Sequence, residues 1–196
     1  MKRAAIGVRM HSGWGALVAL SVDSGRLELL DRRRIVTIDS TVPGAFQPYH
    51  HAATLDLSDS ERYLADYAAL SLRLASAEVS RVLRDLDGYR ILGCAVLLAS
   101  GRPLPSLAKI LASHPLVHTA EGEFFRAAVV AACEDKQIPI TRIAERELAG
   151  KAKTIFGSAA QQTISQISTL AASMGPPWTK DHKNAALAAA MVLKLG

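Results

Sequence analysis

The sequence contains few cysteines and few aromatic residues, and it has no long apolar run. Its two cysteines, Cys94 and Cys133, lack the spacing of a zinc-binding set, and each lies within an apolar stretch. This pattern predicts buried free thiols, which suit a reducing environment. The longest apolar stretches, residues 91–99 and 185–192, are much shorter than the ~20 residues that a helix needs to cross a bilayer. We therefore expect a soluble, cytoplasmic protein that has no membrane partner.

The chain also lacks a glycine-rich phosphate-binding loop and any convincing arrangement of a nucleophile with a general base. Its 23 basic and 18 acidic residues give a formal charge of +5, which permits weak attraction to nucleic acid but does not by itself indicate it. Alanine is prominent, as is typical of closely packed helices. A length of 196 residues fits one domain, 1–196, with a sizeable core.

The N-terminal part of the chain has the pattern of three strands joined by short turns. Residues 4–10, 14–22 and 26–38 are the predicted strands, and turn residues at 11–13 and 23–25 separate them. Consecutive strands with such short connections form an antiparallel meander. Residues 39–57, which contain Pro43-Gly44, Pro48 and the pair His50-His51, have the composition of a loop.

The rest of the chain alternates helices with two isolated strands. Ser58 and Glu61 predict a capping box that opens a long helix ending near Gly88. The apolar run 90–99 is typical of a buried parallel strand, and residues 138–143 form a short fifth strand. Further helices are predicted over residues 106–112, 119–136 with Thr119 as the cap, 145–157, 158–174 and 179–194. Crossover connections make strands four and five parallel to the first, so we expect an α/β fold with a mixed five-stranded sheet and helices on both faces.

Four segments, spread over most of the chain, carry a resemblance to a known family. They are Ile6-Gly-Val-Arg-Met-His-Ser-Gly-Trp-Gly-Ala-Leu-Val18, residues 125–140, the lysine and glycine segment 150–162, and Asp181-x-x-Asn184-Ala-Ala-Leu-Ala188. In this order they resemble the first hairpin, a helix leading into the fifth strand, the segment that follows it and the closing helix of RuvC-type Holliday-junction resolvases. These enzymes belong to the ribonuclease H-like superfamily, so the resemblance implies a ribonuclease H-like fold.

The resemblance also implies a site in which four acids hold two magnesium ions that activate water for phosphodiester hydrolysis. In this sequence Arg9 stands at the first acid position, Leu98 or Ala99 at the second, and Asn184 at the last, so that only Asp181 remains. One carboxylate and one amide are too few anionic oxygens for two divalent cations. We therefore predict a catalytically degenerate domain that needs no metal cofactor and binds nucleic acid or a protein partner.

Arg9 offers a substitute for the missing metal, because its guanidinium would repel a cation and could pair with Asp181. An exposed strand residue is the other interpretation of Arg9. Asp181 and Asn184 share one helix face, since they are three residues apart. Asp181 could also simply occupy a first helical turn capped by Thr179, where an acid suits the helix dipole.

A metal-dependent nuclease with a rearranged set of acids around Asp181 is the alternative function, with Mg²⁺ or Mn²⁺ as its cofactor. It requires Glu121 or Glu123 to replace the missing acid of the fourth strand; otherwise these two acids form a solvated first helical turn. His11, His182 and Asp181 could instead form a mononuclear transition-metal site, although single histidines in turns are usually surface residues.

Basic side chains on the third strand are candidates for a nucleic-acid interface. Alternation along the strand places Arg32 and Arg34 on one face, either as a solvated edge or in contact with phosphates. No interleaved aromatic residues accompany them, which weakens the case for single-strand binding. The adjacent His50 and His51 would face opposite ways on an extended chain, so they are poor joint ligands.

Overall fold

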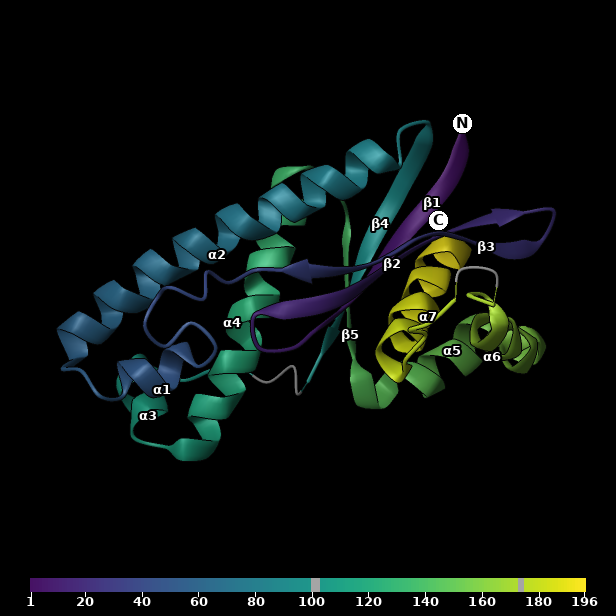
Figure 1. Cartoon of the computed structure of the whole chain (residues 1–196). Helices are drawn as coiled ribbons and strands as arrows, with labels where there is room; N and C mark the ends of the chain where they lie inside the picture. Colours follow the sequence, from purple (N-terminus) through teal and green to yellow (C-terminus); the bar gives the residue numbers. More distant parts are fainter. Residues whose placement is uncertain (100–102, 173–174) are drawn as a thin grey trace.

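The computed structural model describes residues 1–99, 103–172 and 175–196, and its five strands form one sheet in the order β3-β2-β1-β4-β5 (Figure 1). The strands are β1 (Lys2–Met10), β2 (Trp14–Asp23), β3 (Arg26–Val36), β4 (Tyr89–Leu98) and β5 (Ile140–Ala144). β1, β2 and β3 pair antiparallel, whereas β4 pairs parallel with both β1 and β5. The predicted mixed sheet, with its first three strands antiparallel, is confirmed.

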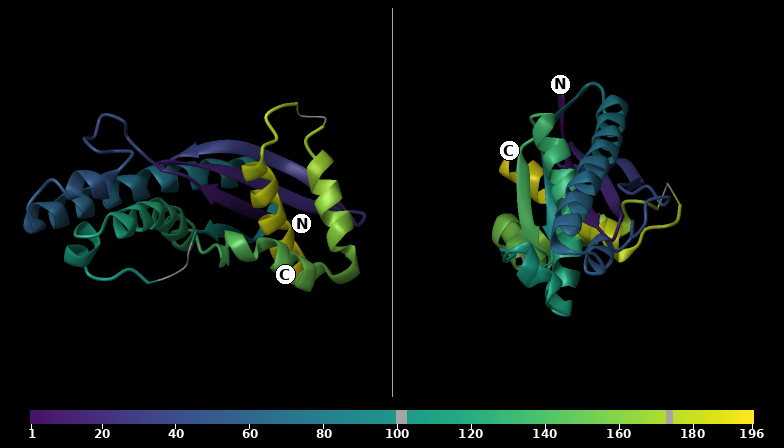
Figure 2. Two further views of the ribbon diagram at one scale, coloured as in Figure 1. Left: turned by 90° about the horizontal axis from the view of Figure 1, so that it is seen from below. Right: turned by 90° about the vertical axis from the view of Figure 1, so that its left-hand side faces the viewer.

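Helices cover both faces of this sheet, as predicted. They are α1 (Pro48–Ala52), α2 (Leu57–Asp85), α3 (Leu107–Leu111), α4 (His114–Asp135), α5 (Leu148–Phe156), α6 (Ala160–Thr169) and α7 (Lys180–Leu195). The long helices α2 and α4 run side by side on one face, and α7, flanked by α5 and α6, lies on the other (Figure 1, Figure 2). Within the part of the chain that the structure describes, no helix is both long enough and apolar enough to cross a membrane.

Alternation along β1 divides the hydrophobic core into two layers. Ile6 and Val8 pack with the residues of α2 and α4, whereas Ala5 packs with those of α7. Successive residues of a strand face opposite sides of the sheet, so the odd-numbered positions of β1 point toward α7. Arg9 belongs to this second set, and the strand therefore directs its side chain to the face that carries α7.

Gly7 allows α7 to lie close against β1. A Cβ atom added at Gly7 would be 1.9 Å from the carbonyl oxygen of Ala185, so only glycine fits between the two backbones. The alanine-rich face of α7 is buried against the sheet, with Ala185 and Ala189 fully inaccessible. This contact brings the first turn of α7 beside the end of β1, where Arg9 lies.

Two helix starts differ from the sequence prediction. α4 begins at His114 because Pro115 lies in its first turn, a position that suits a residue without an N–H donor. The prediction of Thr119 as the cap is therefore wrong: its hydroxyl donates to the carbonyl of Pro115 inside the helix. Consequently, Glu121 lies within the helix and not in its first turn.

The segment before α2 also holds more structure than predicted. The helix α1 lies within residues 39–57, which the sequence analysis took as a loop, and Pro48 is in its first turn. The N-cap of α2 is Asp56, whose side chain accepts a hydrogen bond from the backbone N–H of Asp59 at 2.9 Å, so the predicted capping box of Ser58 and Glu61 is wrong. At the other end of the chain, α6 ends at Thr169, and positions 173–174 of the helix predicted there lie outside the described residues.

Candidate functional site

Asp181 and Arg9 form an ion pair where β1 ends and α7 begins. The Nε atom of Arg9 lies 3.1 Å from Oδ1 of Asp181 and 3.3 Å from Oε1 of Glu145. The three side chains are 23%, 24% and 31% exposed, respectively, so the contact is mostly shielded from water. The predicted contact between Arg9 and Asp181 is confirmed, and Glu145 is a partner that the sequence analysis did not identify.

Three different elements bring these charges together. Arg9 is the second-last residue of β1, and Glu145 begins the 3-10 turn Glu145–Glu147 directly after β5. Asp181 lies in the first turn of α7, and Thr179 is the N-cap of this helix, as predicted. Because Glu145 and Asp181 approach Arg9 from separate segments, only the folded sheet joins them.

His11 and Asn184 extend this contact into a network. Nε2 of His11 lies 2.9 Å from Oδ2 of Asp181, and the Arg9 guanidinium also contacts the His11 ring. The side-chain amide of Asn184 donates to Oε1 of Glu145 at 3.0 Å. We call Arg9, His11, Glu145, Asp181 and Asn184 the Arg9 cluster.

The Arg9 cluster does not fit a pair of divalent cations. Its two carboxylates already share one guanidinium, which would repel a metal ion placed between them. A second guanidinium, that of Arg126, lies at the end of β4, where its Nε donates to the carbonyl of Leu97 at 3.1 Å. Burial lowers the pKa of Arg126. The charge of Glu123 raises this pKa, whereas the nearby charge of Arg9 lowers it further. Cationic groups thus lie both at the end of β1 and beside the end of β4.

Glu121 and Glu123 are not part of the Arg9 cluster. Glu123 pairs with Arg126 at 3.2 Å. Glu121 is buried and its Oε1 lies 2.7 Å from Nδ1 of His50. The second acid that pairs with Arg9, besides Asp181, is therefore Glu145. Neither of these two acids of α4 takes that place.

His182 also turns away from Asp181, so the structure does not assemble the three-residue metal site considered for His11, His182 and Asp181. Nδ1 of His182 accepts a hydrogen bond from the backbone N–H of Thr179 at 3.2 Å, and its ring stacks on Trp178 with centroids 5.7 Å apart. Burial lowers the pKa of His182, and the charge of Arg32 lowers it further. A neutral ring keeps Nδ1 available as the acceptor in this cap.

Arg32 and Arg34 lie on the same face of β3, as the alternation predicted. Arg33 faces the other way and pairs with Asp85 of α2 at 2.6 Å. The Arg34 guanidinium lies 4.2 Å from the ring centroid of Trp14, and Trp14 in turn stacks on His11 at 4.2 Å. A pocket of about 400 Å³ is lined by Trp14, Asp181 and all three of these arginines.

We call Trp14, Arg32 and Arg34 the basic face. The expectation that no aromatic residue accompanies these arginines is wrong, because Trp14, which is distant in the sequence, lies against Arg34. The pairing of β2 with β3 supplies the contact: Ala16 is the register partner of Arg34, and Trp14 is the next residue on the same side of β2. The register of the predicted hairpin was the signal in the sequence that could have placed Trp14 beside Arg34.

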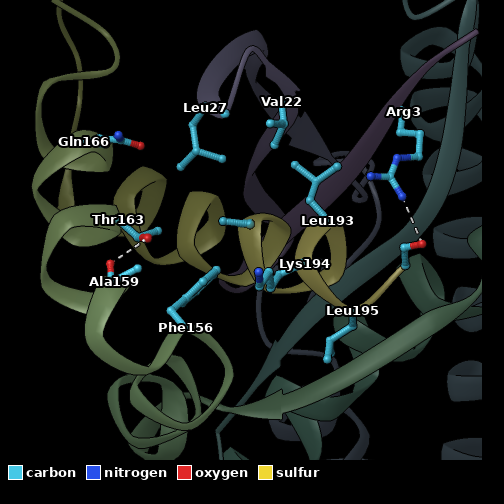
Figure 3. A pocket seen from close by; sticks show the side chains of 13 residues that line it. Arg3, Val22, Leu27, Phe156, Ala159, Thr163, Gln166, Leu193, Lys194 and Leu195 are labelled. Atoms are coloured by element: carbon cyan, nitrogen blue, oxygen red, sulfur yellow. Dashed lines mark hydrogen bonds between the residues drawn. The ribbon is translucent and has the colours of Figure 1, made fainter.

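Another pocket, of about 570 Å³, lies at the opposite end of α7 (Figure 3). Its lining combines the apolar side chains of Leu27, Phe156 and Leu193 with the cationic Arg3. Leu193 is twelve residues after Asp181 on α7, which corresponds to roughly 18 Å along the helix axis. This pocket is therefore separate from the Arg9 cluster.

Comparison with solved structures agrees with this architecture. No protein-family model matches the sequence, and the comparison with curated proteins finds no match. The structure of Thermus thermophilus RuvC matches with a TM-score of 0.56 and 14% identity over 98% of this chain and 96% of that one. T. thermophilus RuvC in complex with a Holliday junction substrate matches with a TM-score of 0.55 and 13% identity over 99% and 96%.

The mixed sheet and its two helical layers define a ribonuclease H-like fold. More particularly, the arrangement is that of the RuvC type, matched over nearly the whole of both chains. At such low identity the likeness is one of fold, so the function has to be argued from the residues of this chain.

Proposed function

We propose that this protein is a catalytically degenerate RuvC-like domain that binds nucleic acid without hydrolysing it. The observation that carries the proposal is the ion pair of Arg9 with both Asp181 and Glu145. In a metal-dependent nuclease of this fold, carboxylates around β1 and the last helix hold the cations that polarise the phosphodiester. Here a guanidinium takes the place of the cation, so the acids stabilise the fold and do not assemble a metal site.

The basic face is the proposed contact surface for nucleic acid. Guanidinium groups bind phosphates through charge-assisted hydrogen bonds, and Arg32 and Arg34 both line one pocket. Trp14 is half-buried, with the Arg34 guanidinium 4.2 Å from its ring centroid and His11 stacked on it at 4.2 Å, so it positions this arginine through a cation–π contact. The solved RuvC complex contains a Holliday junction substrate, so branched DNA is the first ligand to test.

Binding of a labelled four-way DNA junction should weaken steeply as salt rises from about 50 to 200 mM, because phosphate contacts release counterions. The double variant Arg32→Ala/Arg34→Ala should bind more weakly, and its slope of log K against log salt should be smaller by about two. Fluorescence anisotropy at several salt concentrations measures both quantities.

The matched control for this charge change is Arg62→Ala/Arg81→Ala. These two arginines are exposed on α2, where they pair with Asp59 and Glu78. Equal loss of binding in the control and the test variant would show that net charge alone matters. A titration that is flat with salt would contradict nucleic-acid binding and leave a protein partner as the hypothesis.

Cleavage of branched or hybrid nucleic acid should be absent in Mg²⁺ or Mn²⁺, and calorimetry should detect no tight site for either ion. The competing function is a nuclease with rearranged acids. It is favoured by one observation, that Glu145, Asp181, His11 and Asn184 lie in one network. Cleavage that disappears in Asp181→Ala and Glu145→Ala, each purified in the same way as the natural protein, would establish this competing function.

Arg9→Asp should create affinity for Mn²⁺ that the natural protein lacks. The substitution removes the guanidinium and adds a third carboxylate beside Asp181 and Glu145, and hard divalent cations bind such oxygen sets. Isothermal titration calorimetry measures the gain. Arg9→Asn is the control, because it removes the positive charge without adding an anionic oxygen. If both variants bind Mn²⁺ no better than the natural protein, Arg9 is not the residue that excludes the metal.

A further inference from the structure

Three histidines from two helices converge at a point apart from the Arg9 cluster. His50 lies on α1, and His114 and His118 lie four residues apart on one face of α4. One ring nitrogen from each histidine lies within 4.8 Å of the other two. Figure 1 places α1 and the start of α4 at one end of the molecule, with α7 toward the other.

A buried carboxylate binds one of these rings and faces a second. Oε1 of Glu121 lies 2.7 Å from Nδ1 of His50 and accepts a hydrogen bond from the His50 backbone N–H at 3.2 Å. Oε2 of the same residue lies 3.9 Å from Nδ1 of His118. Glu121 is only 4% exposed, so both of its oxygens are directed by packing toward the histidines. In each ring the atom that faces Glu121 is Nδ1, and Nε2 of His118 lies instead 3.1 Å from Nε2 of His114.

We propose that His50, His114 and His118 bind a divalent transition-metal ion, with Zn²⁺ as the best fit, and that Glu121 positions the ligands. Metal-binding histidines commonly donate their second ring N–H to a carboxylate, which fixes the tautomer and the ring orientation. Imidazole nitrogens favour zinc and neighbouring transition metals over magnesium or calcium. Three protein ligands leave the fourth tetrahedral position open for water or for an added ligand.

The distances suit such an ion. Two nitrogens bound tetrahedrally at about 2.0–2.1 Å from zinc lie about 3.3 Å apart. Nε2 of His114 and Nε2 of His118 are 3.1 Å apart, so this pair already has the required separation. His114 is exposed and His50 is half-buried, and both rings can therefore adjust to close the remaining gap. A metal at this point would join α1 to α4.

His51 is the natural control for this proposal. It is adjacent to His50 in the sequence, but its ring packs against Tyr63 with centroids 4.7 Å apart. The adjacent histidines are indeed no joint ligands. His50 instead finds partners on α4, which the sequence analysis did not consider.

The test uses full-length protein without a histidine tag, freed of metal with a chelator. Calorimetry with Zn²⁺ should show one equivalent bound, and Co²⁺ should give the visible absorption bands of a four-coordinate nitrogen site. His118→Ala should weaken Zn²⁺ binding by more than about 100-fold, because it removes a direct ligand. Glu121→Gln should weaken binding by roughly 10–100-fold, as expected for a partner that acts through the ligands. His51→Ala should bind Zn²⁺ as the natural protein does.

Two results would overturn the proposal: the absence of stoichiometric Zn²⁺ binding, or equal affinity in His118→Ala and the natural protein. Circular dichroism of each metal-free variant shows whether it folds. His114→Ala provides a second ligand deletion, because His114 is exposed at the first residue of α4 and its loss leaves the core intact. Binding of Zn²⁺ here does not depend on nucleic-acid binding, so the two proposals can fail separately.

Discussion

Gly7→Ala should destabilise the protein by about 3 kcal/mol or more, at or above the upper end of the usual cost of overpacking. The added methyl group would lie 1.9 Å from the carbonyl oxygen of Ala185 and 3.0 Å from the backbone nitrogen of Ala189. Both atoms belong to the backbone of α7, so no side-chain rotation can relieve the clash. The helix has to move away from β1, which also separates Asp181 from Arg9.

Urea denaturation followed by circular dichroism measures this loss as a lower midpoint. Gly150→Ala is the matched control, because a Cβ atom at Gly150 of α5 meets nothing within 4 Å. Alanine favours a helix over glycine by about 0.5–1 kcal/mol, so the control should be neutral or slightly stabilising. Equal midpoints for Gly7→Ala and the natural protein would show that α7 does not lie as close to β1 as described.

Arg9→Ala should lower the free energy of unfolding by about 2–3 kcal/mol. Removing one partner of a fully buried ion pair costs about 3–5 kcal/mol, because the remaining charge loses its compensation. The cost here is smaller because the side chains of Arg9, Asp181 and Glu145 keep 23–31% exposure. The loss leaves two carboxylates without their shared cation, which adds to the destabilisation.

The comparison for Arg9→Ala is Arg62→Ala on α2. Arg62 is 71% exposed and pairs with Asp59 one turn away, so its loss should cost less than about 0.5 kcal/mol. In the double variant Arg9→Ala/Asp181→Ala, the second change should cost less than Asp181→Ala does alone, because the two residues are coupled. Strictly additive losses, or equal midpoints for Arg9→Ala and Arg62→Ala, would contradict the proposed role of the pair.

Much of the fold could be predicted because its signals are local. The turns around Gly13 and Gly25 separate three strands, and the apolar run that became β4 is typical of a strand buried on both faces. The errors were mainly at helix ends. Pro115 is a local signal for the start of α4, whereas Thr119 matches only the general preference of helices for a threonine cap.

A contact in the site could be predicted only where the expected fold already placed two elements side by side. The resemblance to RuvC-type resolvases placed the end of β1 beside the first turn of the last helix, so the pairing of Arg9 with Asp181 followed from two residue types. Glu145 could not be found in the same way. Its side chain reaches Arg9 because β5 pairs with β4, and no spacing in the sequence encodes that neighbourhood.

The sequence by itself determined the order of the five strands and of the longer helices, and with it the mixed sheet, because each depends on residue type and short-range periodicity. Only the tertiary structure decided the partners of the side chains: Glu145 beside Arg9, Trp14 beneath Arg34, and His50 near His114 and His118. These residues are far apart in the chain, and their contacts exist only after strands pair and helices pack. Whether two residues far apart in the sequence interact depends on where the folded backbone places their side chains. Residue type alone does not specify that placement.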